Sequence, residues 1–384
     1  MTVTCASGLS TEADAERALD EVMREAGMVG ADLALLFLSG AHRENAAKFV
    51  AGVQSRIGPR HLIGCSAQGV IGTRAEVEAG PALALWTAAM PGVEIESFHL
   101  VAESAGGAGG EGEASPFRFR GLPACGDGET LLLLPDPYTV PVEPLMAQIG
   151  PGTRVIGGVA SAGSAPGQNR LVHGQKVFSV GAVGARLRGA EIRPVVSQGC
   201  RPIGRRFVVT KAQENLLVTL AGRPAFEQLQ EVLGDLTQED RSLARRGLQI
   251  GFALDEYKEQ HGHGDFLIRS VFGVDPKSGA IAVSDRFRVG QTVQFQVRDG
   301  ASARDDLESL LRRVSAGDRA KGALLFSCNG RGTHMYGAPD GDIGAVRSVL
   351  GHVAAAGFFA AGEIGPVGGT NHLHGFTASL ALLF

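Results

Sequence analysis

The sequence lacks the features that mark nucleic-acid-binding and membrane proteins. Its 384 residues include 36 basic and 40 acidic side chains, which give a formal net charge of −4. These charged residues are distributed along the whole chain. Proteins that bind DNA, RNA or anionic membranes concentrate Lys and Arg, so we expect neither a nucleic acid nor a membrane as partner. No apolar run approaches the roughly 18 residues of a membrane helix, and no leader pattern opens the chain.

Cysteine is also scarce. The five cysteines, at positions 5, 65, 125, 200 and 328, are far apart, and none forms a Cys-x-x-Cys pair. This spacing argues against a disulfide framework and against a zinc knuckle. A reducing compartment fits such usage, so we expect a cytoplasmic protein.

Several motifs of cofactor and metal enzymes are absent. There is no phosphate loop, no G-x-G-x-x-G between a strand and a helix, no H-E-x-x-H and no EF-hand loop. Two histidine pairs, His261/His263 and His372/His374, have the spacing that points both rings to one face of an extended chain. Solvated or packed histidines explain them better than a metal does, so we expect no metal and no cofactor.

The chain instead repeats one pattern three times: an apolar strand, a turn, a short helix, and a second strand that ends in small residues. Continuous apolar runs are typical of parallel strands buried on both faces, so each copy predicts a βαβ unit. The repetition suggests internal duplication. The strands are expected at 33–38 and 61–69, at 131–134 and 154–163, and at 323–328 and 357–365.

Other segments predict further elements. A capping box at Thr11–Asp14 indicates an amphipathic helix up to Gly27, and Pro224 and Thr237 each begin a helix. Alternating strands between 266 and 297 predict an antiparallel meander. We therefore expect an α/β fold with an N-terminal helix (1–31), a first domain (32–222) and a second domain (223–384).

Small polar residues gather where the predicted parallel strands end, which is the edge where α/β sheets bind ligands. The third copy ends its first strand with Cys328, Asn329 and Arg331, and its second with Glu363. A guanidinium beside a thiol lowers the pKa of the thiol, so Cys328 is a candidate nucleophile with His374 as its base. The alternative is a small buried cysteine, which free cysteines usually are.

Arginines next to apolar strands form a second group of candidates. Arg269 and Arg298 each need an anionic partner, because an unpaired charge inside a sheet is costly. The partner is either an internal carboxylate, for which Asp299, Asp265 and Glu363 are candidates, or the carboxylate of a ligand held by two hydrogen bonds. The segment Ser197–Gly204 adds Gln198, Cys200 and Arg201.

Taken in order, several stretches of the chain resemble the FIST N-terminal domain followed by the FIST C-terminal domain, from about Asp32 to the end. The stretches are GCSAQGVIG, GGVASAG, SQGCRPIG, GDFLIR, VGQTVQFQVRD, LLFSCNGRG, GFFAAGEIGPVGG and LHGFTASL.

The resemblance implies a sensory module that binds small ligands, with amino acids as the suggested class. Many FIST proteins carry an attached output module. Here we expect none, so a separate signalling protein would receive the signal. The family supplies no catalytic residues; its motifs place Gln198, Cys200, Arg201, Cys328, Asn329, Arg331, Glu363 and His374 in a presumed pocket.

We therefore expect a sensor of an amino acid or small carboxylate rather than an enzyme. Arg331 or Arg298 would bind the carboxylate, and Glu363 the amino group. Two alternatives remain open. One is a cysteine-dependent enzyme that uses Cys328. The other is an adaptor that binds a protein through an apolar face of Thr292–Val297.

Overall fold

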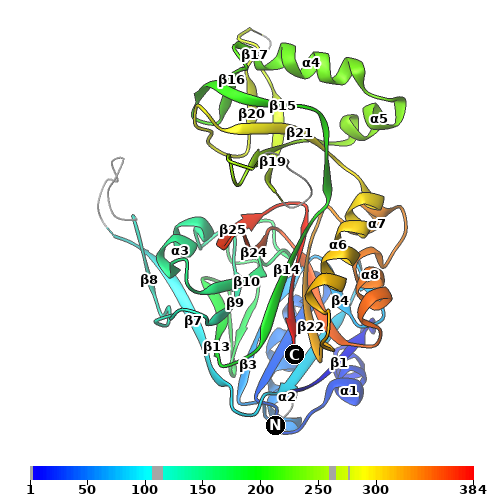
Figure 1. Cartoon of the computed structure of the whole chain (residues 1–384). Helices are drawn as coiled ribbons and strands as arrows, with labels where there is room; N and C mark the ends of the chain where they lie inside the picture. The colour runs from blue at the N-terminus through cyan, green and yellow to red at the C-terminus, as the bar shows by residue number, and fades with distance from the viewer. Residues whose placement is uncertain (1–2, 106–115, 259–264, 276) are drawn as a thin grey trace.

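The computed structural model describes residues 3–105, 116–258, 265–275 and 277–384. Figure 1 shows a body of mixed sheets with a smaller β-rich unit at one end. Parallel pairs and antiparallel strands occur together with helices, so the predicted α/β class is confirmed. The predicted histidine pair His261/His263 lies outside the described residues.

All three predicted βαβ units are present. Each continues into a hairpin and a return strand, which we count as part of the unit. The first unit contains β2 (Leu33–Ser39), η1 (Gly40–Asn45), α2 (Ala46–Arg56), β3 (His61–Ala67), β4 (Val70–Gly72), β5 (Glu76–Val77) and β6 (Leu83–Ala89). The second contains β9 (Thr130–Pro135), α3 (Val142–Ile149), β10 (Arg154–Gly158), β11 (Leu171–His173), β12 (Lys176–Phe178) and β13 (Ala182–Arg188). The third contains β22 (Gly322–Cys328), α7 (Gly332–Tyr336), α8 (Gly341–Leu350), β23 (Ala354–Ala360), β24 (Glu363–Val367), β25 (Thr370–His374) and β26 (Thr377–Leu383).

The three units match residue for residue along their parallel pairs. In each pair a leucine of the first strand lies opposite a glycine of the second, and a Cβ on that glycine would stand 2.0 Å or less from the leucine carbonyl oxygen. Such a close approach admits only glycine. The internal repetition is thus visible in the register. The matched pairs are Leu36 with Gly64, Leu133 with Gly157, and Leu325 with Gly357.

The units also exchange their hairpins in a cycle. The hairpin that follows β3 joins the third sheet, where β4 pairs with β23. The hairpin after β23 joins the second sheet, where β24 pairs with β10, and the hairpin after β10 joins the first, where β11 pairs with β3. Each sheet of the body therefore contains strands from two units, and the three units are interlocked.

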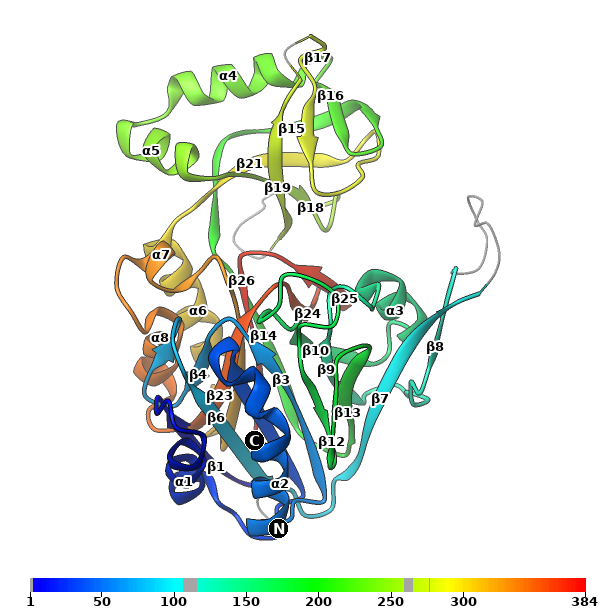
Figure 2. The same ribbon diagram turned by 180° about the vertical axis from the view of Figure 1, so that it is seen from behind.

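One apolar core lies between the three sheets. The rings of Phe37, Phe326 and Phe358 meet there, with centroids 5.2 to 6.4 Å apart. Helices cover the outer faces: α2 lies over the first sheet, α3 over the second and α8 over the third, as Figure 2 shows from behind. Because every strand pair is covered on both faces, its residues are uniformly apolar.

Each unit is preceded by a strand that pairs with its return strand: β1 (Thr4–Ser10), β7 (Glu94–Ser104) and β14 (Ile192–Gln198). The sequence did not predict β1. The helix after it, α1 (Ala15–Ala26), begins later than the capping box suggested. Its N-cap is Asp14, whose carboxylate accepts hydrogen bonds from the backbone N–H groups of Glu16 and Arg17. A short strand, β8 (Phe117–Arg120), pairs with β7.

The smaller unit is a β-barrel inserted between β14 and α6 (Gly300–Val314). Its six strands close because β15 pairs with both β21 and β16. The strands are β15 (Cys200–Gln213), β16 (Leu216–Leu220), β18 (Leu248–Ala253), β19 (Phe266–Val274), β20 (Ile281–Val283) and β21 (Thr292–Arg298), with β17 (Arg223–Pro224), α4 (Ala225–Asp235) and α5 (Gln238–Arg246) attached. Closure leaves the barrel without long free edges.

The predicted meander is correct for β19 and β20 but wrong for β21, which pairs with β15 and β18. Its apolar residues Val293, Phe295 and Val297 face the barrel interior, so they do not form the exposed apolar face that the adaptor alternative requires.

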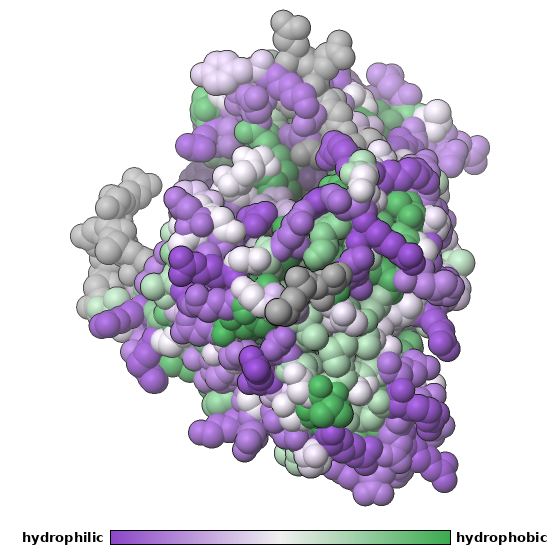
Figure 3. Space-filling model, turned by 60° about the horizontal axis from the view of Figure 1, so that its bottom comes forward, coloured by the Kyte–Doolittle hydropathy of each residue, from purple (hydrophilic) through white to green (hydrophobic). Residues whose placement is uncertain are grey.

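In the described ranges, no helix is both long and apolar enough to cross a membrane. On the face of the molecule in Figure 3, apolar side chains occur in small groups between hydrophilic ones.

Candidate functional site

Arg331 turns into the protein at the end of β22 and is only 1% exposed. It donates hydrogen bonds from Nε and Nη2 to the two carboxylate oxygens of Asp342 in α8, at 2.9 and 2.6 Å. Its remaining donors reach the hydroxyl of Tyr336 and the carbonyl of Phe376. Burial alone would raise the pKa of Asp342, but Arg331 holds this pKa below its ordinary value. The charge of Arg331 is therefore matched within the protein.

Cys328 and Glu363 lie in the same buried region. Burial, and then Glu363 once it ionises, raise the pKa of the Cys328 thiol, and the charge of Arg331 lowers this pKa without offsetting them. The activated thiol suggested by the sequence is thus not found. Glu363 accepts two hydrogen bonds from Thr377, and burial raises its pKa to about 8. A carboxyl with this pKa is protonated at neutral pH, so Glu363 carries no charge for an amino group.

His374 lies opposite Glu363 in the pairing of β24 with β25. Its Nε2 is 3.0 Å from the carbonyl oxygen of Gly365. Burial lowers the pKa of His374 to about 4, so the ring is neutral at physiological pH. A thiolate paired with an imidazolium is the usual arrangement in cysteine enzymes, and neither partner has the pKa that this requires.

The segment that begins at Gln198 forms the junction between body and barrel. Gln198 donates a hydrogen bond to the carbonyl of Phe266 in the barrel, and Cys200 is buried, which raises its pKa to about 12. Arg201 forms ion pairs with Asp299, at 2.8 Å, and with Asp240. Gln198 and Arg201 therefore link the two units, and Cys200 is buried beside them.

Arg298 lies at the end of β21, on the second chain crossing between the units. Its Nη2 donates to the carbonyl of Arg246, and its guanidinium carbon lies 4.5 Å from the ring centroid of Phe376. Within the described ranges it has no carboxylate partner. Its charge is stabilised by the aromatic ring instead.

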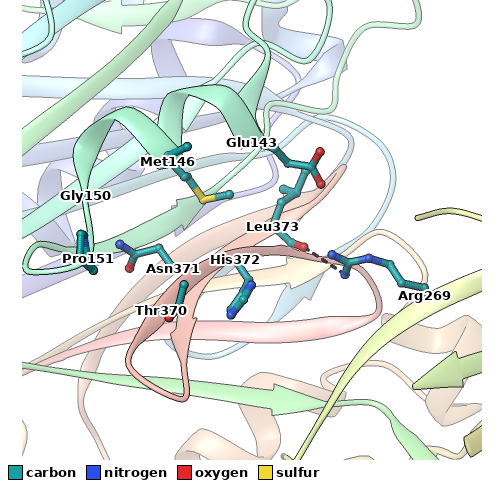
Figure 4. A pocket seen from close by; sticks show the side chains of 10 residues that line it. Glu143, Met146, Gly150, Pro151, Arg269, Thr370, Asn371, His372 and Leu373 are labelled. Carbon is teal, nitrogen blue, oxygen red and sulfur yellow. Dashed lines mark hydrogen bonds between the residues drawn. The ribbon is translucent and has the colours of Figure 1, made fainter. Parts of the chain in front are cut away.

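Arg269 lines a groove between the body and the barrel. The groove consists of two adjoining pockets, of about 330 and 180 Å³, that share Glu143, Arg269 and Leu373. We call it the Arg269 groove. Figure 4 shows α3 and β25 facing each other, with Arg269 reaching in from the barrel. Its other lining residues are Met146, Ala147, Gly150, Pro151, Ile268, Ser270, Ser284, Thr370, Asn371, His372, His374, Gly375 and Phe376.

The described residues do not use all the hydrogen-bond donors of Arg269. Its Nε donates to Asp285 at 2.6 Å, and its Nη1 donates to the carbonyls of Ile268 and Leu373. Nη2 makes no hydrogen bond with any residue that the structure describes. The sequence suggested Asp299, Asp265 or Glu363 as the internal partner of Arg269. The partner is Asp285 instead, because it follows β20, the strand that pairs with β19.

Charges around the groove have both signs. Glu143, in the first turn of α3, is exposed and makes no ion pair or hydrogen bond with the described part of the chain. Burial and then the charge of Arg269 lower the pKa of His372, so this ring is neutral at physiological pH. Asp285 balances the charge of Arg269, and Glu143 adds one carboxylate. A ligand with one negative and one positive group would therefore find a partner for each of them.

The structure thus divides the predicted site residues. Only Arg269 and His374 line the Arg269 groove, and Asn329 lines a different pocket at the strand ends of the body. The others are buried or lie at the junction. Sequence reasoning missed Glu143, Asn371 and Asp285. No signal marks Glu143, because an acidic residue in the first turn is common in ordinary helices.

In the ranges that the structure describes, no three His, Cys, Asp or Glu side chains are grouped closely enough to hold a metal ion.

Comparison with known proteins identifies two family domains, whose boundary falls at β17 inside the barrel. Residues 32–223 match the FIST N domain, and residues 225–366 match the FIST C domain. An uncharacterized protein of Mycobacterium tuberculosis (strain ATCC 25618 / H37Rv) is 44% identical over 384 residues, covering 98% of each chain. An uncharacterized protein of Mycobacterium bovis is 43% identical over 373 residues, covering 96% of this chain and 93% of the relative. The chain therefore belongs to the FIST family.

Proposed function

We propose that this protein senses a small ligand in the Arg269 groove, and that the ligand is an amino acid or a related small carboxylate. FIST domains are associated with sensory signal transduction. The observation that carries the proposal is the unused Nη2 of Arg269, which faces a groove of ligand size. A ligand carboxylate can accept a charge-assisted hydrogen bond from Nη2, the guanidinium nitrogen that no described residue uses.

The charge pattern favours a zwitterion over a simple anion. Asp285 already matches the charge of Arg269, and Glu143 adds a further negative charge to the lining. A ligand with only a carboxylate would meet a net negative groove. An amino acid directs its carboxylate to Arg269 and its ammonium group to Glu143, so each charge has a partner.

The position of the groove supports a sensory role. One wall belongs to the body, through α3 and β25, and the other to the barrel, through Arg269, Ser270 and Ser284. The barrel joins the body at two neighbouring crossings, at Gly199 and Asp299, which share a backbone hydrogen bond. A ligand that touches both walls favours one orientation of the barrel, and this change of population is the signal.

A separate signalling protein would read that orientation. We also retain the cytoplasm as the proposed location, because all five cysteines are free.

The proposal is tested by thermal shift of the full chain with each amino acid and with acetate, succinate and citrate. A ligand that binds the folded state raises Tm by mass action. We expect at least one amino acid to raise Tm at millimolar concentration, and Arg269→Gln and Glu143→Gln to abolish the shift.

Arg118→Gln is the matched control, because Arg118 is exposed on β8, away from the groove. If no compound raises Tm, or if the shift survives both groove substitutions, the proposal is wrong.

A further inference from the structure

A second pocket lies where the parallel strands of all three units end. Its volume is about 550 Å³, within the usual range for small-ligand sites. Each of the six parallel strands contributes to the lining a residue that lies just after the end of the strand. Among the lining residues, these six are Gly40, Gln68, Pro137, Ser161, Asn329 and Ala361.

The six positions are related by the internal repeat. Counting four residues on from the matched leucines 36, 133 and 325 gives 40, 137 and 329. Counting four on from the matched glycines 64, 157 and 357 gives 68, 161 and 361. The pocket therefore lies around the axis that relates the three units, at the carboxyl ends of parallel strands, where open α/β sheets bind their ligands.

Each unit contributes one neutral polar side chain at these positions: Gln68, Ser161 and Asn329. The Oδ1 of Asn329 is shielded from solvent and accepts no hydrogen bond, and its amide nitrogen has no partner in the described ranges. The side chain of Gln68 likewise makes no hydrogen bond with described residues, whereas Ser161 donates to the carbonyl of Phe359 and accepts from the N–H of Gln68. Because Oδ1 itself is shielded, a ligand in the pocket would bond to the amide nitrogen of Asn329 and to the exposed carboxamide of Gln68.

The lining favours an uncharged ligand. Among the described residues that line it, none is Asp, Glu, Lys, Arg or His, so a charged molecule would find no countercharge there. Carboxamides both donate and accept hydrogen bonds, as hydroxyl groups do. Tyr138, 42% exposed, offers an aromatic surface at the rim and anchors its hydroxyl on the carbonyl of Gly163.

We propose that this strand-end pocket binds a neutral cyclic polyol of monosaccharide size, with its hydroxyl groups directed to Asn329 and Gln68. The site is separate from the Arg269 groove, and it requires no contact with the barrel.

The test is isothermal titration calorimetry of the full chain with myo-inositol and D-glucose, beside the charged analogues D-glucuronate and D-glucosamine. We expect at least one neutral polyol to bind more tightly than both charged analogues. Asn329→Ala and Gln68→Ala should each weaken its binding about tenfold, the loss of one or two hydrogen bonds. Gln68 is exposed, so its substitution leaves the fold intact even if Asn329→Ala does not.

Two controls separate the sites. Gln148→Ala removes an exposed glutamine of α3 and should leave polyol binding unchanged, as should Arg269→Gln. The inference is overturned if neither polyol binds, if a charged analogue binds equally well, or if binding survives both pocket substitutions. A response to amino acids that disappears in Arg269→Gln would leave the proposed sensory function standing in any of these cases.

Discussion

Arg331 and Asp342 form a two-point ion pair in which neither side chain is exposed to solvent. The pair joins the end of β22 to the start of α8, and Tyr336 bonds to both partners. It fixes the very segment that the sequence assigned to ligand recognition.

Removing one partner of this pair should be far more harmful than removing both. Arg331→Met leaves the carboxylate of Asp342 buried without a countercharge, which costs about 3–5 kcal/mol of unfolding free energy. The double variant Arg331→Met/Asp342→Leu should recover part of that loss. Urea denaturation followed by circular dichroism measures all three proteins.

The control for this prediction is Arg312→Met, which removes the exposed partner of Glu308 and should cost about 1 kcal/mol or less. If Arg331→Met is no worse than this control, the pair does not stabilise the fold as described.

Stability should depend on pH through Glu363. In the unfolded chain a glutamate ionises near pH 4.3, whereas Glu363 in the folded protein keeps its proton up to about pH 8. Between these values the folded state binds one proton more, so the unfolding free energy falls as pH rises, by up to about 1.4 kcal/mol per pH unit. Glu363→Gln mimics the protonated carboxyl and should make this decline shallower.

The measurement is urea denaturation from pH 5 to pH 8. Glu76, whose pKa burial also raises to about 8, is present in both proteins, so the difference reports Glu363. Glu143→Gln, an exposed glutamate, should follow the wild-type curve. Parallel curves for wild type and Glu363→Gln would show that Glu363 is ionised in the folded state.

Cys328 should be among the slowest thiols to react. Burial raises its pKa and shields its sulfur, as it does for Cys65 and Cys200, whereas Cys125 is only half-buried. Iodoacetamide at neutral pH, followed by peptide mass spectrometry, should label Cys125 first. Labelling of Cys328 ahead of Cys125 would revive the nucleophile alternative. Unfolding in urea is the positive control, because all five thiols should then react.

A methyl group at Gly199 should disturb the junction between barrel and body. A Cβ there would lie 2.7 Å from Nη1 of Arg331 and 2.7 Å from the carbonyl oxygen of Phe376. Gly199→Ala should therefore lower the unfolding free energy by about 1–3 kcal/mol, the usual cost of overpacking. Urea denaturation, which measures the unfolding free energy, and thermal unfolding test this prediction.

Gly273→Ala is its matched control, because a Cβ at that position on β19 would have no atom of the described residues within 4 Å, apart from its chain neighbours. Equal effects of the two substitutions would mean that the junction has room to adjust.

Much of the body was predictable because each repeat carries its own local signals. Uniformly apolar strands, a short helix and a second strand that ends in small residues predicted the three parallel pairs. Prediction was poorer where pairing partners are distant in sequence. Nothing near β1 indicates that it pairs with β6, and nothing near β21 indicates β15 as its neighbour.

The candidate site was predictable only in part. Arg269 was identifiable because a charge in an apolar strand needs a partner, and Asn329 because it follows a buried strand. Their surroundings were not, since Glu143 and Asp285 come from other elements and look ordinary in sequence. Arg331 shows the opposite error: its chemistry suited a ligand, but Asp342 satisfies it.

The sequence alone determined the α/β class, the threefold repetition and the edge of each unit where polar residues gather, because these follow from local hydrophobic periodicity and turn chemistry. The tertiary structure decided which units exchange hairpins, which charges neutralise one another, and that the strand ends of all three units meet at one pocket. These outcomes depend on distances between residues far apart in the chain, which no local pattern records.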